Sequence, residues 1–170
     1  MNLNNYIVNV PNFPKEGIQF KDITPLVADG KAFRYTIETM ADFAKKVNAD
    51  LIVGPDARGF IFGAPVAALL GIGFVPVRKP GKLPRETLTE SYQLEYGENA
   101  LSIHKGDIKK GQNVLIVDDL LATGGTIQAT IKLIEKSGAN VVGLSFLIEL
   151  VELNGAALIK DYTYQSLLKY

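Results

Sequence analysis

The sequence of 170 residues contains no cysteine and only one histidine, His104. Without cysteine, the protein cannot form disulfides, use a thiolate nucleophile or bind zinc through sulfur. A single histidine also excludes a metal site built from several imidazoles. Lys+Arg and Asp+Glu both number 18, so the net charge does not predict nucleic acid or an acidic membrane as a partner. Any anion-binding site must therefore be local.

Long uninterrupted hydrophobic segments are also missing. The N-terminus, MNLNNYIVNVPNF, lacks the basic start and apolar run of a signal peptide. Residues 59–77 carry no charge, but glycines and prolines interrupt them, which favours a helix followed by a strand over a membrane span. With 47% hydrophobic and 21% charged residues, we expect one globular domain over residues 1–170. We expect it to be cytoplasmic and to have no membrane partner.

Apolar runs alternate with segments of helical periodicity along most of the chain. Strands are predicted at 50–55, 73–79, 113–119 and 140–150, and helices at 31–47, around 60–70 and at 125–137. Residues 1–30 look irregular, since prolines and glycines punctuate them. This alternation predicts an α/β fold with an open, mainly parallel sheet flanked by helices. Ligands of such sheets bind beyond the carboxyl ends of the strands.

Residues 81–106 depart from this pattern. Apolar and polar residues alternate around Tyr92, GEN (97–99) reads as a turn, and ALSIHK (100–105) reads as a return strand. We therefore expect a small antiparallel flap, or hood, inserted into the parallel fold. His104, in the return strand, is interpreted as structural.

The segment VLIVDDLLATGGT (114–126) combines two acids with a loop that suits an anion. Glycines and the start of a helix bring backbone N–H groups to one point, where the helix dipole favours negative charge. Asp118 and Asp119 can accept hydrogen bonds from sugar hydroxyls or position a hydrated cation. Because neighbouring side chains of a strand face opposite ways, both serve one ligand only if the chain bends after Asp118. Taken alone, the acid pair also fits an ordinary strand end.

Two more loops should converge at the same edge of the sheet, GPDARG (54–59) and RKPGKLPRE (78–86). Each follows a predicted strand and contains glycine and basic residues. A solvated basic loop is the simpler interpretation of residues 78–86 by themselves. The chain has neither a Walker P-loop nor a GxGxxG fingerprint.

The segment 114–126 resembles the ribose-phosphate signature of the type I phosphoribosyltransferases. FPKEGIQFKDITPL (13–26), GPDARGFIFG (54–63), RKPGKLP (78–84) and SYQLEYG (91–97) extend the similarity over residues 11–168. The first and last of these segments resemble the adenine-specific members of the family. The resemblance implies transfer of a phosphoribosyl group from 5-phosphoribosyl-1-diphosphate (PRPP) to N9 of adenine, giving AMP and diphosphate. Adenine and PRPP are thus the expected small-molecule partners.

The resemblance also implies a role for each matching residue. The 5'-phosphate would lie on Ala122, Thr123, Gly124, Gly125 and Thr126, and the ribose hydroxyls on Asp118 and Asp119. The diphosphate would contact Asp56, Ala57, Arg58, Arg78, Lys79, Lys82 and Tyr96. Mg²⁺ would bind mainly through the diphosphate and water, with no direct protein ligand. Adenine would be read by Gln19, Phe20 and Lys21 of the N-terminal segment 1–30, with Phe20 stacking on the purine.

Catalysis is expected to rest on Arg58, Lys82 and Glu95, with Glu95 managing a proton of the purine imidazole. Main-chain groups of residues 19 and 21 would read the base, although many relatives have an aliphatic residue and an arginine there. The resemblance further predicts a non-proline cis peptide near Asp56-Ala57 and a homodimer in which Arg78 reaches a neighbouring site. Two alternatives remain, a regulator that senses PRPP and an enzyme for xanthine or for hypoxanthine and guanine.

Overall fold

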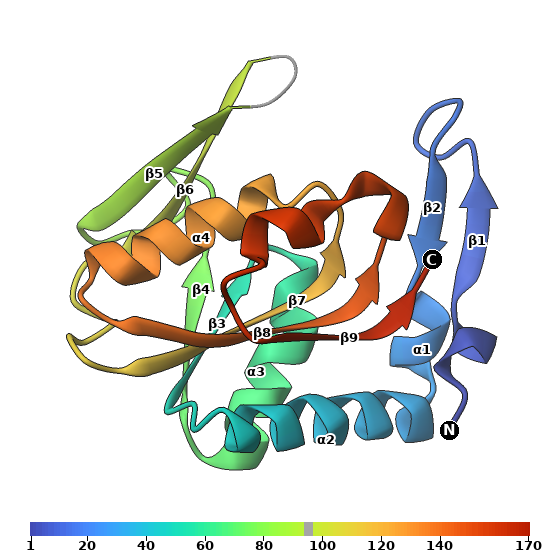
Figure 1. The fold of residues 1–170 in the computed structure, drawn as a ribbon, viewed down its shortest axis with the longest axis horizontal. Coiled ribbons are helices and arrows are strands. Elements are labelled where there is room, and N and C mark those ends of the chain that lie inside the picture. The colour runs from blue at the N-terminus through green and yellow to red at the C-terminus, as the bar shows by residue number, and fades with distance from the viewer. Residues whose placement is uncertain (94–96) are drawn as a thin grey trace. The chain divides into compact units, whose positions relative to one another are not determined.

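The computed structural model describes residues 1–93 and 97–170 (Figure 1). The chain forms two compact units, residues 1–39 and 40–170. The first unit contains a hairpin of β1 (Val8–Pro11) and β2 (Gln19–Asp22), the short helix α1 (Thr24–Ala28) and the start of α2 (Gly30–Lys46). The prediction that residues 1–30 are irregular was therefore wrong. These strands are only four residues long and none of their residues is buried, so they leave too short an apolar pattern to be recognised.

The second unit is built on a parallel five-stranded sheet of order β4-β3-β7-β8-β9. Its strands are β3 (Leu51–Pro55), β4 (Gly73–Val77), β7 (Asn113–Leu121), β8 (Asn140–Glu149) and β9 (Tyr164–Lys169). All five residues of β3 and seven of the nine in β7 are buried, as expected for strands covered on both faces. The predicted parallel α/β sheet is confirmed.

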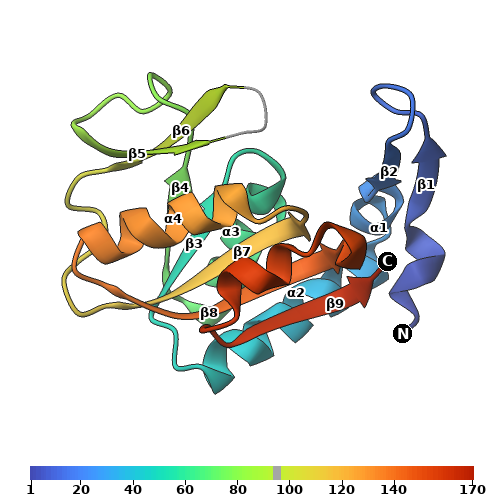
Figure 2. The same ribbon diagram turned by 45° about the horizontal axis from the view of Figure 1, so that its top comes forward.

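Helices cover both faces of this sheet (Figures 1 and 2). The helix α4 (Gly125–Lys136) packs its isoleucines against the face that carries Val53 and Ile116. On the other face, α3 (Arg58–Leu70) brings Gly63 against Ile52 and Phe74. Along β3, residues 52 and 53 point to opposite faces, which explains why the sheet needs a helix on each side.

The predicted flap is an antiparallel hairpin of β5 (Thr87–Gln93) and β6 (Glu98–His104). Glu98 and Asn99 pair with Gln93 and Tyr92, so they belong to the return strand and not to the turn. Reciprocal backbone hydrogen bonds between Arg78 and Ser102, of 3.0 and 2.7 Å, attach the hairpin to the end of β4.

The hairpin is also fastened to α4. The Glu90 carboxylate of β5 forms ion pairs with Lys132, at 3.6 Å, and with Lys136 on that helix. Closer to the α4 N-terminus, the Tyr92 hydroxyl lies 3.4 Å from Thr126 Oγ1. The flap strand β5 and the helix α4 are therefore linked by side chains at both ends of the helix.

The strand β9 was not predicted, because most of its residues are only half-buried. Two short 3₁₀ turns, Val151–Leu153 and Gly155–Ile159, connect β8 to this edge strand. The uncharged segment 59–77 forms α3 and β4, as predicted. None of the helices within residues 1–93 and 97–170 is both long enough and apolar enough to cross a bilayer.

Candidate active site

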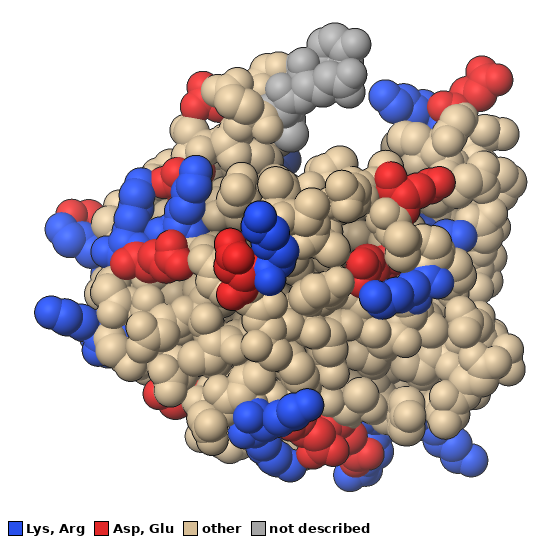
Figure 3. Space-filling view, in the orientation of Figure 1, with Lys and Arg blue, Asp and Glu red and all other residues tan. Residues whose placement is uncertain are grey.

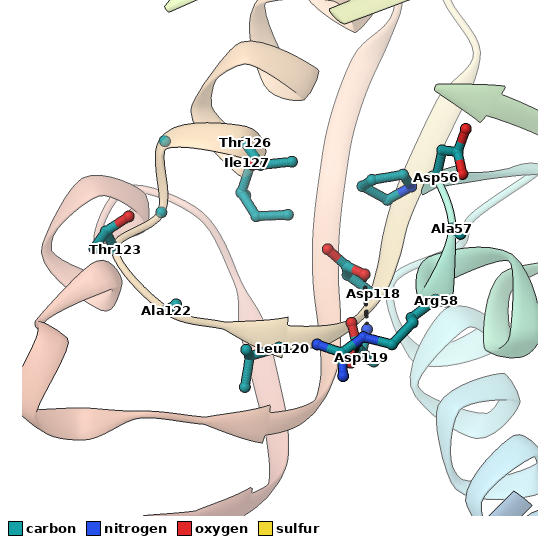
Figure 4. Close-up of a pocket in the computed structure, with 13 residues that line it drawn as sticks. Asp56, Ala57, Arg58, Asp118, Asp119, Leu120, Ala122, Thr123, Thr126 and Ile127 are labelled. Atoms are coloured by element: carbon teal, nitrogen blue, oxygen red, sulfur yellow. Dashed lines mark hydrogen bonds and ion pairs between the residues drawn. The ribbon is translucent and has the colours of Figure 1, made fainter. Parts of the chain in front are cut away.

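The loops after β3 and β7 meet at the carboxyl edge of the sheet and line one cavity of about 270 Å³. Figure 4 shows the two loops facing one another across it. β3 and β7 are hydrogen-bonded neighbours in the sheet, so the residues that follow them emerge side by side. The lining residues are Pro55, Asp56, Ala57, Arg58, Asp118, Asp119, Leu120, Ala122, Thr123, Gly124, Gly125, Thr126 and Ile127. The predicted convergence of these loops is confirmed.

The third loop borders a neighbouring cavity of about 380 Å³, lined by Lys79 and Lys82. Asp56 and Thr126 line both cavities, which places the two lysines next to the first one. Arg78 has a different environment, because its Nε donates to Asp56 Oδ2 at 2.8 Å and its Nη1 to the Lys82 carbonyl at 3.3 Å. Positive charge therefore gathers at one side of the cavity. On the face drawn in Figure 3, acidic and basic side chains are otherwise interspersed.

The loop of residues 122–126 has the geometry of an anion site. Gly124 adopts φ 89°, which a glycine allows without strain, and α4 begins at the next residue. Within the described chain, no side chain caps the N-terminus of α4. The N–H groups of its first turn thus remain available to an anion, and the helix dipole favours negative charge there. The Tyr92 ring lies beside Gly125: a Cβ built on Gly125 would be 3.4 Å from Tyr92 Cδ2.

The two aspartates are nearly buried, with exposed fractions of 8% for Asp118 and 5% for Asp119. Arg58 Nε forms an ion pair with Asp119 Oδ2 at 2.9 Å, and the Asp119 N–H donates to Asp118 Oδ1 at 2.8 Å (Figure 4). The Asp118 carboxylate lies so close to Gly59 that a Cβ there would be 3.0 Å from Oδ1. A bend after Asp118 was the condition for both acids to serve one ligand. β7 instead continues to Leu121, and both acids nevertheless line the cavity.

This environment changes the acidity of both groups. Burial, followed by the charge of Asp119, raises the pKa of Asp118 well above its ordinary value. Burial also raises the pKa of Asp119, and the Arg58 guanidinium opposes that effect. Both carboxyl groups are therefore harder to ionise than a free aspartate, although Arg58 favours the charged form of each.

The peptide bond between Asp56 and Ala57 is cis, as the resemblance predicted. The Asp56 N–H donates to the Val77 carbonyl at 2.8 Å, which joins the first loop to the end of β4.

The predicted base-reading residues lie in the first unit, on β2. Asn9 of β1 connects two of them, because its Nδ2 donates to Gln19 Oε1 at 2.8 Å and its Oδ1 accepts from Lys21 Nζ at 3.0 Å. Phe20 packs edge-to-face on Phe13 with ring centroids 5.2 Å apart. Successive strand residues alternate in direction, so Phe20 lies on the opposite face of the hairpin from its two neighbours.

Two predicted site residues, Glu95 and Tyr96, lie outside the described residues. His104 is engaged at the base of the flap. Its Nε2 accepts from the Arg85 N–H at 3.3 Å, and its Nδ1 lies 3.4 Å from Asp107 Oδ2. These contacts fit the interpretation of His104 as a structural residue.

Sequence reasoning missed Leu120 and Tyr92. Leu120 follows the aspartates and is a half-buried apolar wall of the cavity. Its position inside an apolar run concealed it, because core and pocket leucines look alike in a sequence. Tyr92 was read only as part of an alternating strand, and its contact with Thr126 spans 34 residues. In the described ranges no three His, Asp or Glu side chains are placed to hold a metal ion.

Comparison with known proteins assigns the chain to a class of enzymes. Residues 28–168 match the family model of the phosphoribosyl transferase domain, and that span includes the sheet and the whole cavity. The protein is therefore a phosphoribosyltransferase.

Solved structures identify the branch. The chain is 54% identical to adenine phosphoribosyltransferase from Thermoanaerobacter pseudethanolicus, with a TM-score of 0.95 and coverage of 99% of this chain and 98% of that one. The enzyme from Rhodothermus marinus is 47% identical, with a TM-score of 0.93 and coverage of 99% and 96%. The enzyme from Saccharomyces cerevisiae, solved with an imino-altritol bisphosphate and adenine, is 39% identical, with a TM-score of 0.93 and coverage of 98% and 96%. The chain belongs to the adenine phosphoribosyltransferase family.

Proposed function

We propose that the cavity between residues 55–58 and 118–127 is the active site for transfer of the 5-phosphoribosyl group. The enzyme moves this group from PRPP to N9 of adenine, giving AMP and diphosphate, a reaction of purine salvage. One observation carries the assignment of the site. An uncapped, glycine-rich helix N-terminus and a pair of buried carboxylates line the same cavity, and a sugar phosphate needs both kinds of group.

The 5'-phosphate would bind the loop 122–126 through backbone N–H groups and the hydroxyls of Thr123 and Thr126. A threonine hydroxyl has one proton and two lone pairs. Thr126 can therefore donate to the phosphate while accepting from Tyr92, which lies 3.4 Å away. Asp118 and Asp119 would accept hydrogen bonds from the 2'- and 3'-hydroxyls of the ribose. Leu120 supplies an apolar wall beside them.

The diphosphate would lie toward the loops at 54–59 and 78–86. Lys79 and Lys82 border the adjoining cavity, and Asp56 and Ala57 line the first one. Mg²⁺ fits this arrangement as a companion of the diphosphate. Among the described residues that line the two cavities, Asp56 is paired with Arg78 and Asp119 with Arg58, and the lysines can share the remaining negative charge. Bound there, the ion would neutralise charge on the leaving diphosphate. Arg58 would add a cation on the Asp119 side.

Positive charge should develop on the ribose as the diphosphate leaves. The carboxylates beneath the sugar stabilise that charge, and the cations of the two loops stabilise the leaving group. Glu95 would act at the purine imidazole, and Tyr96 would cover the diphosphate end. Water must be kept out, since it would capture the ribosyl cation, and we assign this task to the flap of residues 81–106.

The activity itself is tested by incubating the protein with PRPP, Mg²⁺ and each purine base. We expect AMP from adenine, at least about 100-fold less product from hypoxanthine, guanine or xanthine, and no turnover after chelation of Mg²⁺. Product formation is measured by chromatography. PRPP binding without any product would favour the regulator, and turnover of another base alone would contradict adenine specificity.

Adenine recognition is assigned to the main chain of β2 with Phe20 stacking on the ring. Truncation of Phe20 to alanine should raise the KM for adenine by about 10- to 100-fold, because a stacked aromatic contact is lost. Gln19→Ala and Lys21→Ala serve as matched controls, since these side chains are bound to Asn9 on the opposite face of the hairpin. Their KM for adenine should stay near the wild-type value. Equal effects of all three substitutions would refute backbone readout.

We also propose one catalytic domain over residues 1–170 and a homodimer, both from the family resemblance. In the single chain Arg78 is bonded to Asp56, so it would have to leave this partner to reach a neighbouring site. A solution mass twice that of one chain would support the dimer, and the mass of a single chain would contradict it.

A further inference from the structure

The loop 122–126 is backed by a segment that is distant in sequence, the 3₁₀ turn Gly155–Ile159. Gly155 is buried, and its contact with the loop is very close. A Cβ built on Gly155 would lie 2.2 Å from the carbonyl oxygen of Ala122, where any real side chain would collide. One Cα hydrogen of Gly155 must therefore point at that oxygen.

The contact is repeated from the side of the loop. A Cβ on Gly124 would lie 3.1 Å from the Gly155 carbonyl oxygen and 3.3 Å from Leu158 Cδ1. Two glycines thus face each other across the boundary between the loop and the turn. Asn154, at φ 54°, directs the chain into this position, which asparagine tolerates better than most residues.

Gly155 is needed for space and not for its conformation. Its φ lies outside the left-handed region that favours glycine, unlike that of Gly124. Its closest neighbours are backbone atoms of Ala122 and the Leu121 side chain. Backbone atoms cannot rotate away as a flexible side chain would, so a methyl group here must move residue 122 itself. Residue 122 begins the stretch assigned to the phosphate.

We propose that Gly155 and the turn it begins are a positioning element for the 5'-phosphate. The turn holds the Ala122 carbonyl in place, and this sets the direction of the N–H groups from residue 123 to the first turn of α4. The inference rests on the proposed phosphate role of residues 122–126. Gly155 itself would touch no substrate, since it is not among the described lining residues of the three cavities that border residues 122–126.

The inference is tested by titrating ribose 5-phosphate into the protein and its Gly155→Ala variant by calorimetry, followed by kinetics. We expect the Kd for ribose 5-phosphate and the KM for PRPP to rise by about tenfold or more, because displacements near 1 Å at a positioned group are costly. The KM for adenine should stay unchanged. Gly143→Ala is the matched control. Gly143 lies in β8, away from the loop, and a methyl group there would be 3.2 Å from Leu115 and from Phe43. It should lose stability but bind ribose 5-phosphate normally.

A second variant keeps the test decisive if Gly155→Ala does not fold. Leu158 is 45% exposed, and its Cδ1 would lie 3.3 Å from a Cβ on Gly124, so Leu158→Ala removes apolar atoms beside the loop without inserting any. It should weaken ribose 5-phosphate binding by about threefold. Unchanged Kd values in every variant that folds would overturn the inference and leave the proposed function intact. Absence of AMP formation by the wild-type protein would instead refute the function, and the titration would still decide the role of the turn.

Discussion

Replacement of Asp118 and Asp119 together by asparagine is expected to lower kcat/KM for PRPP by at least about 10³-fold, judging from the loss of single preorganised groups in other active sites. Asparagine has nearly the same shape, but it carries no charge to stabilise the cation that develops on the ribose. Its amide also offers donors where the sugar hydroxyls need acceptors. Initial rates at varied PRPP, with adenine saturating, measure the effect.

Glu149→Gln is the matched control for this variant. Glu149 is also a nearly buried carboxylate at the carboxyl end of the sheet, paired with Lys169 at 3.3 Å, but it does not line the cavity. We expect it to keep near wild-type turnover. Near wild-type turnover in the double Asp118/Asp119 variant would show that the two carboxylates do not hold the ribose. The single variant Asp119→Asn should also lower kcat/KM for PRPP, because Arg58 then loses its ion pair.

The single variant Asp118→Asn is expected to be more stable than the wild-type protein at pH 8, by on the order of 1 kcal/mol or more. Burial raises the pKa of Asp118 in the native state, so the native state retains its proton to a higher pH than the unfolded chain. Between the two pKa values the native state binds more protons, and its free energy of unfolding falls as the pH rises. Asparagine has no proton to lose, so this decrease in the free energy of unfolding does not occur in the variant. Its side-chain oxygen can still accept a hydrogen bond from the Asp119 N–H.

The gain should disappear below about pH 4, where Asp118 is protonated in both states. Urea unfolding at a series of pH values measures it. Asp107→Asn is a control of opposite sign, because hydrogen bonding to Arg85 lowers the pKa of Asp107. Its carboxylate stabilises the native state at neutral pH and ceases to do so as the pH falls, so this variant should be less stable at pH 8. A less stable Asp118→Asn protein at pH 8 would contradict the cost of burying that acid.

The core of the fold could be predicted because its signals are local. β7 is apolar from Val114 to Val117, and the loop after it carries glycine and threonine where a helix begins. The edge strand β9 could not be predicted in this way, since its residues are mostly half-buried and apolar and polar side chains do not alternate regularly along it. The β1–β2 hairpin was missed for a related reason, because its strands are only four residues long and contain no buried residue.

The site was predictable to the extent that it follows strand ends. Topology brings residues 55–58 and 118–126 to one edge of the sheet, and this requires only the order of strands. Contacts between distant segments were not accessible. Neither the position of Tyr92 beside Thr126 nor that of Gly155 behind Ala122 leaves a periodic signal, because each depends on how two separate elements pack.

The attachment of the flap to α4 has a consequence for how substrates can enter and leave. Glu90 binds two lysines along the helix, and Tyr92 reaches its first turn, where the phosphate is assigned. The strand β5 and the anion site are thus mechanically coupled, and β5 cannot swing away from α4 without breaking those ion pairs. Binding of a phosphate to residues 122–126 should therefore shift the position of β5, and the position of β5 should change the affinity for the phosphate.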